Sequence, residues 1–318
     1  MELKWKCKEQ MPRVAVLMSA YNGEKYIQQQ IDSILMQTYE NVVLYVRDDG
    51  SSDHTLEILK RYEEKQALVL LRGDNLGYIN SFFHVMKECE NADYYAWCDQ
   101  DDIWIPEKIE RAVKMLETDK TEYKNETDKP VLYFSSYDYY DESMHYQKKG
   151  LIHPRGPSFS NSLMDCIPLG FNSVFNHEAR RIMEKNIPQK CCGHDWWTYM
   201  ICAAFGRVIY DRDFSSVKYR RLEQSVSPGG KSFIEMQVWR FKKFFVNDYF
   251  AKIREQLREF GQLYGNCLDE KDKKVMALFV DKHYSLLKAV KKCFYPVWFR
   301  QGMVEELMVR VLFLTGKL

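Results

Sequence analysis

In the first hundred residues, short apolar runs alternate with amphipathic segments, and this alternation constrains the fold more than any other feature. The apolar runs predict strands buried on both faces, and they cover residues 13–19, 42–46, 68–71 and 94–98. The intervening segments have apolar side chains at helical spacing, and they cover residues 24–37, 55–65 and 80–89. A strand–helix–strand order at this pace predicts parallel β-α-β units.

The second half of the chain is less regular, and its pattern changes near residue 230. Before that point we expect a helix over 194–204, a charged loop over 119–129, and short strands at 131–136, 172–175, 208–210 and 217–219. Beyond it, the spacing predicts long amphipathic helices over 232–265, 270–292 and 303–314. The sequence therefore predicts an α/β domain over 1–230 and a helical region over 231–318.

Composition narrows the class of protein. A net charge of +1 over 318 residues argues against a dedicated nucleic-acid binder. The first residues lack the apolar core of a signal peptide, and no apolar run approaches the roughly 20 residues that cross a bilayer. Nine irregularly spaced cysteines indicate reduced thiols rather than a disulfide framework. We therefore expect a cytoplasmic protein.

The stretch Asp99-Gln100-Asp101-Asp102 places three carboxylates directly after the predicted strand 94–98. Carboxylates this close repel one another unless a cation or a polyhydroxyl ligand lies between them. Oxygen ligands suit Mg²⁺ or Mn²⁺, and these ions usually bind together with a phosphate. The alternative is a solvated acidic turn or a helix cap, and the stretch alone does not decide between the two.

Polar motifs also follow the other predicted strands. In α/β sheets ligands bind beyond the carboxyl ends of the strands, which is where these motifs fall. An aromatic ring in such a motif can stack on a nucleobase, and carboxylates accept hydrogen bonds from base N–H and ribose hydroxyl groups. Each motif could equally be an ordinary turn or helix cap. The motifs are Ser19-Ala20-Tyr21-Asn22, Asp48-Asp49-Gly50-Ser51-Ser52-Asp53 and Asn75-Leu76-Gly77.

A fourth motif, Gly193-His194-Asp195-Trp196-Trp197, precedes the apolar helix expected at 194–204. Flat aromatic faces beside a carboxylate suit a sugar site, where the rings stack and the acid acts on a hydroxyl. Aromatic surroundings also raise the pKa of a carboxylate by desolvation, as a general base requires. The alternative is that Asp195 only interacts favourably with the helix dipole.

In their order and placement, these motifs resemble glycosyltransferase family 2. The resemblance covers residues 13–230, and residues 170, 172–176 and 194–197 are similar to its rhamnosyltransferase-like branch. It implies a GT-A fold with a mixed, mainly parallel sheet: a Rossmann-like nucleotide half over about 13–118 and an acceptor half over about 131–230. It also implies an inverting, metal-dependent transferase. The donor would be a nucleotide-diphosphate sugar, with dTDP-rhamnose favoured over a UDP-sugar, and the acceptor a saccharide or lipid-linked saccharide of a surface polysaccharide.

The resemblance also assigns roles to single residues. Asp101 would ligate Mg²⁺ or Mn²⁺ on the diphosphate, and Asp195 would be the general base. The acceptor sugar would meet His194, Trp196 and Trp197. The nucleotide and donor sugar would contact Ser19, Tyr21, Asn22, Asp48, Asp49, Asn75, Asp99 and Asp102.

One position departs from the pattern of this branch. After a Tyr-Arg pair matching Tyr219-Arg220, the branch usually has a histidine that can ligate the metal, and this chain has Leu222. A non-catalytic nucleotide-sugar-binding subunit is therefore an alternative. A nucleotidyltransferase is another, although residues 19–26 lack the Gly-rich, basic loop that would grip a triphosphate.

The helical region carries a basic-aromatic cluster over residues 239–245, echoed by Phe294, Trp298, Phe299 and Arg300. Such segments can lie on an anionic membrane surface, which would suit a lipid-linked acceptor at the inner face of the membrane. The favoured alternative is a helical cap on the catalytic domain or a dimer interface.

Overall fold

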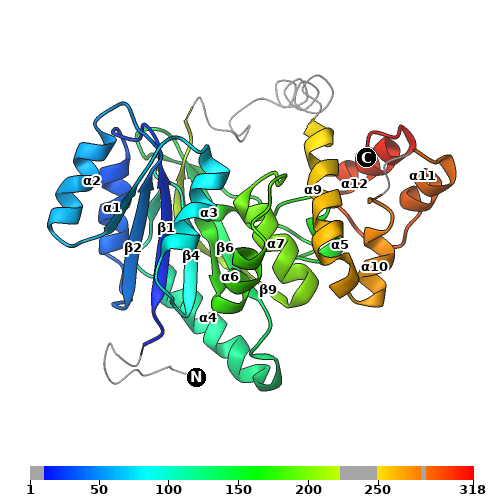
Figure 1. Ribbon diagram of the computed structural model, residues 1–318, viewed down its shortest axis with the longest axis horizontal. Coiled ribbons are helices and arrows are strands. Elements are labelled where there is room, and N and C mark those ends of the chain that lie inside the picture. Colours follow the sequence, from blue (N-terminus) through cyan, green and yellow to red (C-terminus); the bar gives the residue numbers. More distant parts are fainter. Residues whose placement is uncertain (1–10, 223–248, 281–283) are drawn as a thin grey trace.

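A computed structural model describes residues 11–222, 249–280 and 284–318 (Figure 1). Its strands are β1 Val14–Ala20, β2 Val42–Asp48, β3 Val69–Arg72, β4 Tyr94–Cys98, β5 Ile103–Trp104, β6 Val131–Tyr140, β7 Tyr146–Lys149, β8 Ser173–Asn176 and β9 Arg207–Arg220. The α-helices are α1 Ile27–Leu35, α2 Thr55–Glu64, α3 Tyr78–Glu88, α4 Lys108–Glu122, α5 Phe159–Ser162, α6 His177–Lys185, α7 His194–Phe205, α9 Tyr249–Tyr264, α10 Glu270–Met276, α11 Leu286–Cys293 and α12 Met303–Leu314. Short 3₁₀ helices are η2 Lys124–Glu126, η3 Gly170–Asn172 and η5 Gly265–Cys267.

One mixed sheet forms the centre of the described structure. Its strand order is β3-β2-β1-β4-β8-β6-β9-β5, and β7 pairs with the C-terminal part of β6. The strands β1 to β4 are mutually parallel where they pair, as the alternating sequence predicts. The strand β8 is antiparallel to both β4 and β6, and β9 runs parallel to β6. The sheet is therefore mainly parallel, and the predicted α/β fold class is confirmed.

Two apolar clusters lie on opposite faces of this sheet. Alternate residues of one strand belong to different clusters: Ala15 and Leu17 join the first cluster, while Val14 and Val16 join the second. This is the period-two alternation of a strand buried on both faces. The first cluster includes α3, α6, α7 and the C-terminal helices, and the second includes α1, α2 and α4 (Figure 1).

The C-terminal helices extend the molecule along its longest axis, beyond α7 (Figure 1). The helix α9 makes the connection, because Phe260 packs edge-on against Trp197 at 5.4 Å between ring centroids. Tyr264 of the same helix contacts Phe205 at 5.7 Å. None of the described helices combines the length and the apolar character needed to cross a membrane.

Three sequence-based predictions of elements are wrong. The charged segment 119–129 is not all loop: α4 continues to Glu122, because Asp119 is buried and pairs with Arg207 at 2.7 Å. The two short strands at 208–210 and 217–219 are one strand, β9, whose register with β6 shifts around residues 212–214. The expected helix 270–292 is divided, since α10 ends at Met276 and α11 begins at Leu286. The domain boundary expected near residue 230 lies outside the described residues.

A buried lysine links α4 to η3. The Lys108 side chain is almost fully enclosed, donates to the Phe171 carbonyl at 2.9 Å and lies over the Trp104 ring. Burial lowers the pKa of Lys108 to about 7, and the nearby acidic groups of Cys98 and Asp102 offset only part of this effect. Between about pH 7 and pH 10, Lys108 is therefore protonated in the unfolded chain but mainly neutral in the folded chain.

We predict that stability rises with pH through this lysine. Because the unfolded state binds more protons between about pH 7 and pH 10, the free energy of unfolding should gain about 2 kcal/mol from pH 7 to pH 9. In Lys108→Met, which keeps the volume but cannot titrate, this gain should vanish. Urea unfolding at both pH values measures the difference, and equal pH dependence in the two proteins would contradict the assignment.

Candidate functional site

Strand register brings the polar motifs to one edge of the sheet. Ala20, the last residue of β1, pairs with Asp48 at the end of β2, and Asp48 pairs with Arg72 at the end of β3. On the other side of β1, Met18 pairs with Cys98, so the acidic stretch that starts at Asp99 leaves the sheet at the same edge. The motifs after β1, β2, β3 and β4 are therefore neighbours.

Asn22 ties the first motif to the second. Its backbone N–H donates to the Ser51 hydroxyl at 3.0 Å, and its side-chain oxygen accepts from the Ser52 N–H at 2.8 Å. Its φ of 49° is left-handed, a conformation that asparagine tolerates better than most residues. In the second motif Gly50 has a φ of 76°, and its backbone passes so close to the Asn75 N–H that a side chain would collide.

Asp49 is committed to neighbouring protein groups. It is buried, forms an ion pair with the buried Arg47, and accepts from the N–H groups of Leu76 and Gly77 at 2.9 and 3.0 Å. These bonds fix the third motif. The Asn75 side chain is exposed and also accepts from the Gly77 N–H.

The Ser19 hydroxyl extends this polar network. It donates to the Ser81 hydroxyl at 2.6 Å, and Ser81 in turn accepts from the Arg47 guanidinium at 3.1 Å. Asp48 is differently placed. One of its carboxylate oxygens accepts from the Ser51 N–H at 3.2 Å, and the other meets no donor among the described residues. Of the two adjacent carboxylates, Asp48 therefore keeps more capacity for a ligand.

Tyr21 presents a half-exposed ring at this edge. Its backbone is held by the Gln100 side chain, which accepts from the Tyr21 N–H and donates to the Tyr21 carbonyl, both at 2.9 Å. Gln100 also fills the space next to Gly23, where a side chain would meet its amide. The acidic stretch thus positions the first motif through its one uncharged member, a role that the sequence analysis did not assign.

The carboxylates of the acidic stretch are crowded. Burial, together with the nearby charges of Asp101 and Asp195, raises the pKa of Asp99 to about 8. Burial raises the pKa of Asp101 as well, and that of Asp102 to well above its ordinary value. Asp102 is fully enclosed, and one of its oxygens meets no donor among the described residues.

Arg220 holds this crowded stretch in place. Its backbone N–H donates to the Asp102 carboxylate at 2.9 Å, and its guanidinium donates to the Asp101 carbonyl at 2.8 Å. The same guanidinium reaches the Glu142 carbonyl and the Gln29 side chain. Two sequence signals point to this residue: Arg220 directly follows a predicted strand, and the Tyr219-Arg220 pair resembles the rhamnosyltransferase-like branch.

The acidic stretch fits a divalent cation that is shared with a phosphate. The pKa increases of Asp99, Asp101 and Asp102 mean that negative charge is unfavourable there, and a cation would offset it. The described residues hold no cluster of three side chains able to chelate a metal by themselves. Leu222, two residues beyond Arg220, has a hydrocarbon side chain that cannot be a ligand. The protein would therefore supply few ligands, and phosphate oxygens the others.

Asp195 lies close enough to Asp99 to raise the pKa of that carboxyl. The two oxygens of Asp195 accept from the N–H groups of Gly170 at 3.1 Å and Trp196 at 2.8 Å. Gly193 leaves room for this arrangement, since a Cβ there would lie 2.5 Å from the Asp195 carboxylate. Tyr78, at the start of α3, donates to the Cys192 carbonyl at 3.2 Å. Burial of its hydroxyl raises its pKa, and the charges of Asp195 and Asp99 add to this increase. Tyr78 is thus a further site residue, without a sequence signal.

The aromatic neighbours of Asp195 are core residues. His194 stacks on Phe82 with 3.7 Å between ring centroids, and burial lowers its pKa to about 4, so it is neutral. Trp197 has no exposed surface, and Trp196 is buried with its indole N–H bonded to the Ser162 carbonyl at 2.6 Å. The structure does not bring these three side chains to a surface that a sugar could reach.

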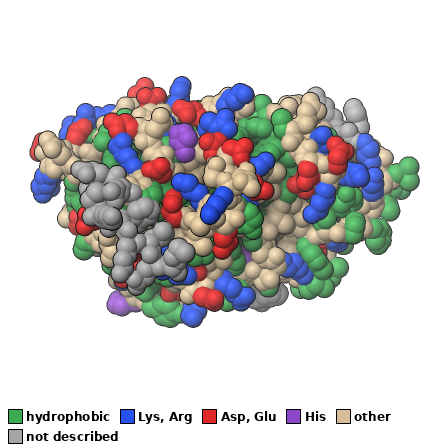
Figure 2. All heavy atoms as spheres, turned by 90° about the horizontal axis from the view of Figure 1, so that it is seen from below, with side chains coloured by type: hydrophobic (Ala, Val, Ile, Leu, Met, Phe, Trp, Pro, Cys, Tyr) green, Lys and Arg blue, Asp and Glu red, His purple; other side chains and the backbone are tan. Residues whose placement is uncertain are grey.

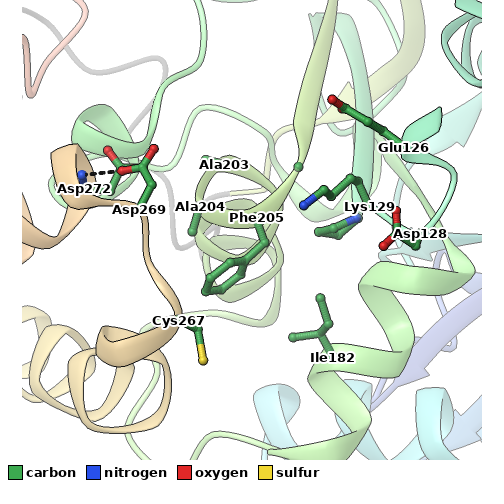
Figure 3. Close-up of a pocket in the computed structure, with 12 residues that line it drawn as sticks. Glu126, Asp128, Lys129, Ile182, Ala203, Ala204, Phe205, Cys267, Asp269 and Asp272 are labelled. Carbon is green, nitrogen blue, oxygen red and sulfur yellow. Dashed lines mark hydrogen bonds between the residues drawn. The ribbon is translucent and has the colours of Figure 1, made fainter. Parts of the chain in front are cut away.

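A pocket of about 560 Å³ lies at the opposite edge of the sheet (Figure 3). Pro130 and Gly206, which precede β6 and β9, contribute to its wall. Asp269 and Asp272 face it from the C-terminal helices, and the Asp272 N–H donates to the Asp269 carboxylate at 2.7 Å. Because it opens at the amino ends of the strands, this pocket is separate from the motif-bearing edge.

Comparison with known families explains this arrangement of motifs. Residues 15–185 match the family model described as glycosyl transferase family 2. The chain belongs to glycosyl transferase family 2. The predicted family and its GT-A fold are confirmed, and the family match spans the four motif-bearing strands β1 to β4.

Two relatives in this family differ in how much of the chain they match. An uncharacterized glycosyltransferase of Haemophilus influenzae is 41% identical over 111 residues, which is 34% of this chain and 34% of that protein. The dTDP-rhamnosyl transferase RfbG of Shigella flexneri is 26% identical over 227 residues, covering 65% of this chain and 72% of RfbG. The chain thus matches about a third of the Haemophilus protein and most of RfbG.

A solved structure shares the fold over nearly the whole family 2 chain. The S. aureus TarS fragment 1–349, in complex with UDP-GlcNAc, superimposes with a TM-score of 0.58 and 16% identity. The alignment covers 96% of this chain and 80% of the TarS fragment. At this identity the likeness is one of fold.

We predict that Asp49 and Asp48 differ in their effect on stability. Asp49→Asn leaves the buried Arg47 charge without its partner and should cost about 3 kcal/mol, lowering the melting temperature by roughly 5 °C or more. Asp48→Asn, the matched control, removes a charge whose second oxygen has no donor, and should stay within about 1 kcal/mol of wild type. Thermal unfolding of both variants measures this, and equal losses would contradict the assignment.

Proposed function

We propose that this family 2 protein is a glycosyltransferase that moves a sugar from a nucleotide-diphosphate donor to an acceptor hydroxyl. The observation that carries the proposal is the meeting of two carboxylate groups. The acidic stretch after β4 and Asp195 of α7 are distant in sequence, yet Asp195 acts electrostatically on Asp99. In this proposal one group would meet the donor diphosphate and the other the acceptor, which a transfer reaction brings together.

We further propose rhamnose as the sugar and dTDP-rhamnose as the donor. The support is the match to RfbG, which extends over 65% of this chain and reaches into the acceptor half. A UDP-sugar is the alternative, because the TarS fragment with the same fold binds UDP-GlcNAc. The acceptor would be a saccharide or lipid-linked saccharide in surface polysaccharide synthesis. All eight cysteines in the described residues are free thiols, which suits a reducing, cytoplasmic setting.

The donor would bind along the motif-bearing edge. Tyr21 offers a half-exposed ring for the base, and Asp48 a carboxylate oxygen for base or ribose groups. Asp99 would accept from the ribose, while Asp102 supports the site through its bond with Arg220. Asp101 would hold Mg²⁺ or Mn²⁺. When bound, such a cation offsets the charge that develops on the departing diphosphate.

Asp195 would act as the general base in a single displacement. It takes the proton of the acceptor hydroxyl as that oxygen forms a bond to the anomeric carbon. The bond from this carbon to the diphosphate oxygen breaks on the opposite face, and the leaving group takes the electron pair. Configuration is therefore inverted. The N–H groups of Gly170 and Trp196 fix the direction in which the carboxylate points.

Asp195→Asn should abolish sugar transfer but leave donor binding nearly unchanged. The amide keeps the side chain's shape but cannot accept the proton, so we expect turnover to fall at least about a thousandfold. Donor affinity measured by calorimetry should change less than about threefold. Asp213→Asn, at an exposed carboxylate of β9, serves as the matched control and should behave as wild type. Turnover in Asp195→Asn within tenfold of wild type would refute the base assignment.

Asp101→Ala should remove the metal dependence of nucleotide binding. In wild type, Mn²⁺ should increase the thermal stabilisation by dTDP and dTDP-rhamnose, since the cation joins carboxylate and phosphate charges. In Asp101→Ala this increment should disappear, while stabilisation by thymidine alone persists. Equal shifts with and without Mn²⁺ in wild type would count against a metal site.

The same thermal-shift panel separates the alternatives. A larger shift with UDP-sugars than with dTDP-rhamnose would replace rhamnose in the proposal. Donor binding without turnover, when tested with saccharide acceptors and donor hydrolysis, would favour a non-catalytic binding subunit. Pyrophosphate release from a nucleoside triphosphate and sugar phosphate would indicate a nucleotidyltransferase.

A further inference from the structure

Apolar side chains are exposed in unusual number at the C-terminal end of the molecule. The described residues hold 23 large exposed apolar side chains, and twelve of them lie between Tyr284 and Leu314. Figure 2 shows hydrophobic side chains gathered at the end that these helices form, with Lys and Arg side chains beside them. A concentration of this kind marks a surface that meets another apolar phase.

The helix α12 supplies a continuous apolar face. Its outward residues follow helical spacing over three turns, and each is between 39% and 67% exposed: Met303, Val304, Leu307, Met308, Val311 and Leu314. At 100° per residue they fall within an arc of about 140°, and no charged residue of α12 lies inside it. In α11, Leu286, Leu287, Val290 and the following Phe294 form a similar exposed row. We call these ten residues the α11–α12 face.

Buried contacts on the opposite side of α12 fix the orientation of this face. Phe313, on the opposite side of α12, is fully buried and packs edge-on against Phe299 at 5.3 Å between centroids. The buried Glu306 pairs with Arg310 at 2.7 Å and accepts from the Phe299 N–H at 2.9 Å. Phe299, one of the residues that echo the basic-aromatic cluster, is therefore a core residue; residues 239–245 of that cluster lie outside the described residues. Because Phe313 and Glu306 are held in the core, the apolar side chains on the other side of α12 face outward.

Positive charge surrounds the α11–α12 face. Residues 284–318 contain six Lys and Arg and two Glu. Apart from the buried Glu306–Arg310 pair and Arg300, which pairs with Asp165 at 3.1 Å, they carry four lysines and one Glu. Lys288 and Lys291 are exposed on α11. Burial and the charges of Lys288, Arg254 and Arg258 lower the pKa of Lys292 to about 8, which shows that four cations are gathered on α9 and α11. The partner of such a surface is anionic.

We propose that the α11–α12 face binds the surface of an anionic lipid bilayer. Its apolar side chains would enter the boundary between headgroups and acyl chains, and its lysines would meet the anionic headgroups. The half-exposed Trp298, stacked on Arg155 at 3.8 Å, has the amphipathic character of residues at this depth. Because no described helix is long and apolar enough to cross a membrane, the helices lie in the interface.

A second copy of the chain fits this face less well. A twofold dimer would place the same patch on both sides, so Lys288 and Lys291 of one copy would approach those of the other. Such like charges repel, whereas an anionic bilayer offers the opposite charge over its whole area. Charge complementarity therefore selects the bilayer.

Vesicle co-sedimentation with the full chain tests this proposal independently of any transfer activity. We expect wild type to bind phosphatidylcholine vesicles containing about 30% phosphatidylglycerol at least tenfold more tightly than pure phosphatidylcholine vesicles. The variant Val304→Glu/Leu307→Glu/Val311→Glu should lose binding to both. Lys288→Glu/Lys291→Glu should weaken binding to the anionic vesicles by more than about thirtyfold, since each lysine near such a surface contributes roughly fivefold and each introduced glutamate adds repulsion.

A matched control uses exposed apolar residues elsewhere. Leu35 and Met36, at the end of α1, are 48% and 66% exposed. Leu35→Glu/Met36→Glu should bind vesicles as wild type does, and circular dichroism melting should show that all variants remain folded. Wild type that stays in the supernatant with anionic vesicles, or a triple variant that still sediments, would overturn the proposal. So would a dimer in light scattering that the triple variant converts to a monomer.

Discussion

Arg220 and the acidic stretch form the interaction on which the motif-bearing edge depends. Three carboxylates leave β4 within four residues, and their burial and mutual repulsion oppose the charged forms. Arg220 supplies the opposing attraction, since it bonds Asp102 through its backbone and the Asp101 carbonyl through its guanidinium. Because Arg220 ends β9, a strand from the far side of the sheet holds the motif-bearing edge. The elements beyond β4 are thus part of the scaffold of that edge.

The sequence predicted most of the fold and the grouping of motifs, and the reasons are local. Buried parallel strands are nearly all apolar, and β4 has the predicted bounds because polar residues flank Tyr94–Cys98 on both sides. The motifs could be grouped because parallel strands end at one edge. Contacts between residues far apart in the sequence were harder to predict. Asp119 extends α4 only because Arg207, 88 residues later, reaches it, and β9 reads as two strands because its middle departs from the register of β6.

The partners and burial of the side chains in the site were the hardest features to predict from the sequence. Asp48 and Asp49 are adjacent and chemically identical, yet Asp49 is occupied by Arg47 and two backbone N–H groups. The aromatic rings beside Asp195 have the composition of a sugar platform, but α7 is buried on nearly all sides, so Trp197 faces the core. A motif specifies which chemistry is present. Neighbouring elements decide which atoms remain free to perform it.

The packing of α9 on α7 has a consequence for how the halves of this protein depend on each other. Trp197 follows Asp195 by two residues, and its ring rests on Phe260 of α9. The first residue of α9, Tyr249, lies near enough to Asp195 to feel its charge. The packing of α7, the helix that carries Asp195, therefore depends partly on α9. The C-terminal helices support α7 from one side. Substitutions in these helices would therefore be limited by the need to keep Asp195, more than fifty positions earlier in the chain, in place.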